Sequence, residues 1–225
     1  PNRIKILLLL LCLVGELKHN AMKVFITVFL ALFLTGAMAQ TNKEAEALLK
    51  QVRAKTEAYK SQSIEFNNEM DAPTGKDDRS RSVRKSNGKA HVKGNKYRIE
   101  MDGIIILNDG IKTYMVYPDD EEISVLEADE DEEGLQLTPS KILAEYEKGY
   151  SYALAGKETI EGKTIQYIRL KPKANAEIKE IVIGVDMSTK QLYSFKQFGH
   201  NGITTTLTVT KYTVNQPLKD ELFSI

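Results

Sequence analysis

Hydrophobic positions along the chain follow two different periods. In residues 41–60 the apolar side chains fall on one stripe with a period of 3.6 residues, which predicts an amphipathic helix. The stripe consists of Ala45, Leu48, Leu49, Val52 and Tyr59. Thr41 and Glu44 have the spacing of a capping box at the start of this helix. From Ser63 onward the period becomes two, as expected of strands with one face in water.

Eleven strand-like runs follow one another with little between them. They lie near residues 63–70, 83–93, 96–101, 103–108, 112–117, 122–126, 150–157, 163–171, 178–186, 190–199 and 203–213. The connections are short and carry turn residues such as Gly94-Asn95 and Asp102-Gly103, which predicts antiparallel neighbours. A second helix is predicted over 138–146, with Thr138 as N-cap and Pro139 at the first helical position.

These elements predict a mainly β fold with few helices. Eleven antiparallel strands form a large curved sheet, an incomplete barrel whose concave face the helices cover. Two helices are too few to fill that face. An apolar groove that holds a ligand is therefore expected.

The candidate lining of this groove is apolar and aromatic and lies on alternating strand positions. It consists of Ile64, Phe66, Met70, Tyr97, Ile99, Met101, Tyr114, Val116, Tyr150, Tyr152, Leu154, Ile168, Leu170, Ile181 and Ile183. A plain hydrophobic core explains the same pattern. The candidate lid comprises Ile142, Leu143 and Tyr146 in the second helix.

The N-terminal region has the three parts of a secretory signal. Residues 22–39 run from Met22 and Lys23 through an apolar stretch to a small-residue site, so we expect cleavage between Ala39 and Gln40. The apolar stretch is too short to span a membrane. We interpret residues 1–21 as an over-translated or non-native extension, and residues 40–225 as a single domain, truncated at its C-terminus.

Composition excludes several classes of function. Of the 31 basic and 31 acidic side chains, four basic and one acidic lie in the first 39 residues, so the remainder carries a formal charge of about −3. Such a surface disfavours binding to nucleic acid. The only cysteine, Cys12, also lies in that first segment, which excludes disulfides and cysteine catalysis in residues 40–225.

Catalytic and metal chemistry find little support. Residues 40–225 contain two histidines, His91 and His200, and no serine elbow of the G-x-S-x-G type. The acidic run 127–133 begins like a calcium loop but has Ser140 where a bidentate Glu is needed, so a solvated loop is favoured over an ion site. We expect no enzyme activity, no metal and no cofactor.

The order and spacing of several segments resemble the LolA family, the periplasmic outer-membrane lipoprotein carriers of double-membrane bacteria. The segments are the first helix, IEF (64–66), HVKGNKYRIEM (91–101), LNDGIKT (107–113), LTPS (137–140), LKPK (170–173) and the closing Leu222-Phe223. The resemblance implies an incomplete barrel of 11 antiparallel strands with a helical lid. It also implies a monomer in the periplasm that accepts triacylated lipoproteins from an inner-membrane ABC transporter and passes them to an outer-membrane receptor or membrane.

The chain departs from the family pattern at two places. Well-studied members have an Arg-Pro pair whose Arg latches the lid, where this chain has Gly94-Asn95. Lys93 or Arg98 replaces that latch if its side chain reaches the lid. Ile99 stands where those members have Trp. The alternative function is a periplasmic lipid-binding sensor or protein-interaction module on the same fold, and an envelope hydrolase ranks third.

Overall fold

The computed structural model describes residues 42–75, 80–126, 143, 146, 149–174 and 177–225. The predicted leader, its cleavage site at Ala39 and Gln40, the calcium-like run and Ile142 lie outside these residues. The first helix runs over 42–57. The strands are β1 (Gln62–Pro73), β2 (Arg81–Lys93), β3 (Lys96–Met101), β4 (Ile104–Asn108), β5 (Thr113–Tyr117), β6 (Glu122–Leu126), β7 (Tyr150–Ile160), β8 (Lys163–Pro172), β9 (Ile178–Asp186), β10 (Gln191–Gly199) and β11 (Thr204–Val214). Two 3-10 helices are η1 (Pro118–Asp120) and η2 (Asp220–Phe223).

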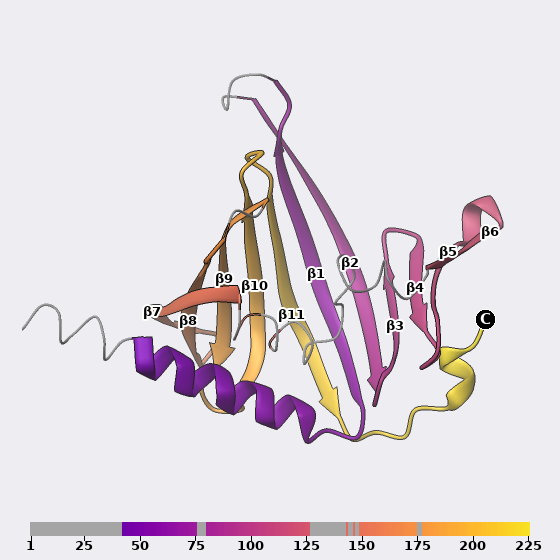
Figure 1. The fold of residues 1–225 in the computed structure, drawn as a ribbon, viewed down its shortest axis with the longest axis horizontal. Helices are drawn as coiled ribbons and strands as arrows, with labels where there is room; N and C mark the ends of the chain where they lie inside the picture. Colours follow the sequence, from indigo (N-terminus) through magenta and orange to yellow (C-terminus); the bar gives the residue numbers. More distant parts are fainter. Residues whose placement is uncertain (1–41, 76–79, 127–142, 144–145, 147–148, 175–176) are drawn as a thin grey trace, which may run out of the picture. The chain divides into compact units, whose positions relative to one another are not determined.

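All eleven strands form one antiparallel sheet. The order across it is β6-β5-β4-β3-β2-β1-β11-β10-β9-β8-β7 (Figure 1). The strands at its two ends, β6 and β7, are not paired with each other among the described residues, so this sheet is not closed into a barrel. The predicted fold class, an incomplete antiparallel barrel of about 11 strands, is confirmed.

Tight turns set the antiparallel order. Asp102 and Gly103 both have positive φ, at 55° and 78°, and join β3 to β4 in two residues. Such left-handed pairs match the twist of the strands they connect. The exception to local pairing is β1, which is joined to β11 as well as to β2. This pairing places the first and the last strand of the chain side by side in the middle of the sheet, as Figure 1 shows for β1 and β11.

The N-terminal helix forms as its period predicts, but it ends at residue 57, so Tyr59 of the predicted stripe lies beyond it. Ala45, Leu48, Leu49 and Val52 are buried, and they pack in one cluster with residues of β8 and β9. The outer side of the helix carries the i,i+4 ion pairs Glu46–Lys50 and Arg53–Glu57. The helix therefore covers one face of the sheet, which we call the helix-covered face.

Candidate functional site

The strand register defines which side chains share the helix-covered face. One continuous row of cross-strand partners crosses seven strands, from β7 to β2. The row consists of Leu154, Ile168, Ile183, Phe195, Leu207, Asn68 and Ser86. It is apolar for five positions and then becomes polar in β1 and β2. This row connects two hydrophobic clusters of the described residues.

The first cluster holds the helix against β8 and β9. Ile168, Leu170 and Ile181 are fully buried there, and Tyr150, Tyr152 and Leu154 of β7 pack at its margin. The burial of these apolar side chains contributes most of the free energy that holds the helix against the sheet.

The second cluster lies on β1, β2 and β3. It joins Ile64 and Phe66 to Tyr97 and Ile99, with Met101 at its margin. Tyr97 is 1% exposed, and its hydroxyl lies 3.3 Å from the Thr113 Oγ1 atom. The buried side chains of this cluster pack against one another, and the partly buried Leu207, Val209 and Tyr212 of β11 pack at its margin.

Most predicted lining residues lie on the helix-covered face, as their alternation predicted. Met70 shares that face with Ile64 and Phe66 but is 37% exposed. Two predicted lining residues do not lie there. Tyr114 pairs with Leu107, which pairs with Arg98, and Val116 belongs to the same side of β5, so both lie on the opposite face. Their grouping with Tyr97 and Ile99 is corrected by the register.

Leu143 and Tyr146 of the candidate lid pack into the first cluster. Leu143 and Tyr146 are 2% and 8% exposed. The Tyr146 ring meets the Tyr150 ring edge to face at 5.0 Å and stacks on Phe195 at 6.4 Å. Burial raises the pKa of Tyr146 well above its usual value, so this phenol is neutral. These two residues thus cover part of the apolar face through aromatic contacts.

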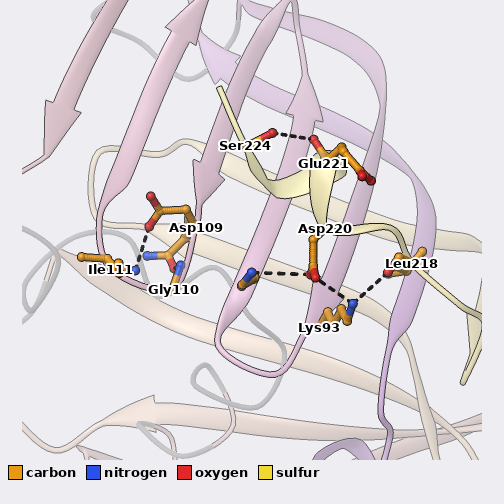
Figure 2. Close-up of polar contacts among 10 residues, drawn as sticks. Lys93, Asp109, Gly110, Ile111, Leu218, Asp220, Glu221 and Ser224 are labelled. Carbon is orange, nitrogen blue, oxygen red and sulfur yellow. Dashed lines mark hydrogen bonds and ion pairs between the residues drawn. The ribbon is translucent and has the colours of Figure 1, made fainter.

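The predicted latch has a different partner. Lys93 donates from Nζ to the Leu218 carbonyl oxygen at 2.9 Å and to Asp220 Oδ1 at 3.1 Å (Figure 2). Arg98 donates to Glu100 at 2.6 Å. Both side chains lie on the face opposite the lid, because they alternate with Val92, Tyr97 and Ile99 along their strands. The latch prediction is therefore wrong for these two residues.

Lys93 instead binds the C-terminal segment, residues 218–224, through Leu218 and Asp220. Asp220 accepts from Lys93 and also lies 3.5 Å from Lys96 Nζ, and these cations lower its pKa. Beside this contact, Phe223 is buried and borders a cavity of about 460 Å³ with Tyr114 and Asp109. No local pattern predicts this contact, because Lys93 and Asp220 are far apart along the chain.

A larger cavity of about 580 Å³ lies where β1, β2 and β3 meet the β3–β4 turn. Phe66 and Met101 border it together with Glu65, Lys89 and Glu100. Its volume suits a small ligand. Its charged border does not suit an acyl chain.

The described residues offer little for catalysis or metal binding. His91 Nδ1 lies 3.0 Å from the Ser63 hydroxyl oxygen, but the nearby Glu65 and Glu100 are paired with Lys211 and Arg98. No group of three His, Cys, Asp or Glu side chains among the described residues could hold a metal ion. In the same part of the chain, no helix has the length and apolar character needed to cross a membrane.

A comparison with known protein families shows which family the chain belongs to. The model of the family described as "Outer membrane lipoprotein carrier protein LolA" matches residues 61–225. The chain belongs to the LolA family. The region that matches the LolA family contains all eleven strands and η2, and it leaves the N-terminal helix outside.

Several solved structures are similar to this LolA-family chain. An uncharacterized conserved protein from Thermus thermophilus has a TM-score of 0.54 at 7% identity, over 81% of this chain and 93% of that chain. A LolA superfamily protein from Nitrosomonas europaea has a TM-score of 0.39 at 13% identity, over 78% and 97%. The Mycobacterium tuberculosis lipoprotein LppX has a TM-score of 0.46 at 16% identity, over 77% and 98%. No curated protein matches the chain.

Proposed function

We propose that this protein is a periplasmic carrier that shelters the acyl chains of lipoproteins on the helix-covered face and moves them from the inner to the outer membrane. Membership of a family described as a lipoprotein carrier is the observation that carries the proposal. The partners are triacylated lipoproteins, an inner-membrane lipoprotein-releasing ABC transporter, and an outer-membrane receptor or membrane. The protein acts as a monomer and performs no catalysis.

The energetics of the cargo require an apolar shelter. An acyl chain of about 16 carbons costs roughly 12 kcal/mol to expose to water, at about 0.8 kcal/mol per methylene. A bilayer shelters the chain equally well. Capture and release must therefore be nearly balanced against the membrane.

Packing on the helix-covered face supports such a balance. Leu143 and Tyr146 fill space against Phe195 and the β8–β9 cluster. When the lid opens, it exchanges these contacts for contacts between the sheet and an acyl chain, so the net free-energy change is small. The aromatic contacts of Tyr146 are the part of this packing that the cargo replaces.

The second candidate is a lipid-binding sensor or protein-interaction module on the same fold. The burial of Ile168, Leu170 and Ile181 favours it, because a permanently filled face needs no cargo. The two candidates differ in whether the face opens to a lipid.

Uptake of a fluorescent fatty acid tests the carrier proposal. The wild type should bind it with a defined stoichiometry, and a Phe195→Ser variant, which puts a hydroxyl beneath Tyr146, should bind it more weakly. Arg169→Ser is the matched control, because Arg169 lies on the opposite face of β8. A wild type that binds no fatty acid would favour the interaction module.

A further inference from the structure

Asn68 is the one strongly polar side chain in the middle of the row that crosses the helix-covered face. It lies between Phe66 and Met70 on that face of β1, opposite Leu207 of β11 and Ser86 of β2. It is 4% exposed. An apolar side chain would suit the period-two pattern of the strand better.

The amide of Asn68 is only half satisfied. Its Nδ2 donates to Ser86 Oγ at 3.3 Å, whereas its Oδ1 is buried and accepts no hydrogen bond. Among the described residues it is the one buried side-chain oxygen or nitrogen without a partner. Buried acceptors of this kind are rare, because losing water without gaining a donor is unfavourable.

Other buried polar side chains of the sheet, unlike the Asn68 oxygen, have hydrogen-bond partners. Gln62 donates to the Thr56 carbonyl oxygen and accepts from the Tyr212 hydroxyl. Gln166 donates to two backbone carbonyl oxygens, those of Gly156 and Tyr167. The free acceptor of Asn68 is thus a local exception and not a general feature of this sheet.

We propose that Asn68 Oδ1 is a polar anchor for the cargo, accepting a hydrogen bond from an N–H or O–H group at the head of a bound acyl chain. This inference rests on the proposed function, since the cargo reaches Asn68 only when the packed face opens. The apolar side chains that continue the row, Leu207, Phe195 and Ile183, then receive the chain itself. Lipids whose acyl chain is attached next to a donor are preferred over lipids without one.

A matched pair of ligands isolates the hydrogen bond. N-methylpalmitamide and methyl palmitate have the same chain and shape, but only the amide has an N–H donor. In competition against a bound fluorescent fatty acid, the wild type should bind the amide about tenfold more tightly, as one net hydrogen bond implies. Monopalmitoylglycerol has hydroxyl donors and no N–H group. Its affinity, compared with that of the amide, shows whether a hydroxyl or an amide group donates to Asn68 Oδ1.

Two variants assign the preference to this residue. Asn68→Leu, of similar volume, should bind the amide and the ester with equal affinity, and it should be at least as stable as the wild type. Asn67→Leu is the control, because Asn67 is exposed and points to the opposite face of the same strand, and it should keep the tenfold preference.

The outcomes separate the two proposals. Equal binding of the amide and the ester by the wild type, or a preference that survives in Asn68→Leu, overturns the anchor while the carrier function stands. A wild type that binds neither ligand overturns the carrier function itself. Equal binding of the two ligands by the wild type overturns the anchor without any variant, so the proposal stays falsifiable even if Asn68→Leu fails to fold.

Discussion

Phe66 on β1 lies directly opposite Gly88 on β2, and its ring occupies the space that a Cβ atom at position 88 would need. Gly88 has no positive φ, so the glycine is needed for space and not for backbone conformation. The second hydrophobic cluster therefore depends on the absence of a side chain at one position of β2.

Gly88→Ala should displace Phe66 and lower the free energy of unfolding by about 1–3 kcal/mol, the usual cost of overpacking. For a domain of this size each kcal/mol lowers Tm by about 2–4 °C. Differential scanning calorimetry measures the change. Gly156→Ala on β7 is the control, since nothing lies within 4 Å of its Cβ position. Equal Tm values for the two variants would show that Phe66 moves aside without cost.

Leu143→Ala should change the rate and extent of fatty-acid uptake more than it changes Tm. Leu143 is 2% exposed, but its contacts are those that the proposed opening already breaks. Ile168→Ala truncates a fully buried residue of the sheet and should lower Tm by the larger amount, because β8 stays packed in both states. Stopped-flow uptake and thermal melts compare the two. If Leu143→Ala loses as much stability as Ile168→Ala and takes up lipid normally, Leu143 is an ordinary core residue.

Lys93→Met should release the C-terminal segment from the sheet. The variant loses the donor to the Leu218 carbonyl oxygen and to Asp220, so amide hydrogen exchange should become faster across residues 218–224. Lys89→Met removes another lysine from the same face of β2 and should leave that exchange unchanged. Unchanged exchange in Lys93→Met would mean that buried Phe223 and the Lys96–Asp220 pair hold the segment without Lys93.

His91 should make the fold sensitive to mild acid. Burial, the largest cause, lowers its pKa from 6.5, with Lys89 and Arg98 acting in the same direction and Glu100 and Glu65 opposing them. The unfolded chain then takes up the proton more readily than the folded chain, so stability is present above about pH 6.5 and falls as the pH drops through this range.

The His91→Gln variant should therefore lose less Tm than the wild type between pH 7.5 and pH 5.5. His200→Gln is the control, because His200 lies in an exposed turn. If the Tm of the wild type falls by the same amount as that of His91→Gln between these pH values, His91 is not the source of the acid sensitivity.

The sequence predicts the strands well, because the turn residues that bound them are local. Asp102-Gly103 marks the β3–β4 turn without reference to the rest of the chain. The face of each residue is harder to predict where both faces are apolar. In β4 and β5 the alternation is ambiguous, since Ile104, Ile105 and Ile106 follow one another and Met115 lies between Tyr114 and Val116.

Register resolves this ambiguity, and it depends on pairing across strands. It places Tyr114 and Val116 on the face opposite Ile99, and it places Lys93 on the side of the C-terminal segment and away from the lid. The free acceptor of Asn68 is likewise a property of the packed structure, because the sequence alone does not state which donors lie near a side chain.

Native mass spectrometry of the protein purified from a periplasmic extract, followed by lipid analysis of whatever accompanies it, tests the carrier function most directly. We predict a one-to-one complex with a triacylated lipoprotein. A protein that emerges without lipid, and that also fails to take up a fluorescent fatty acid, would contradict the carrier function and show that the helix-covered face is only a hydrophobic core.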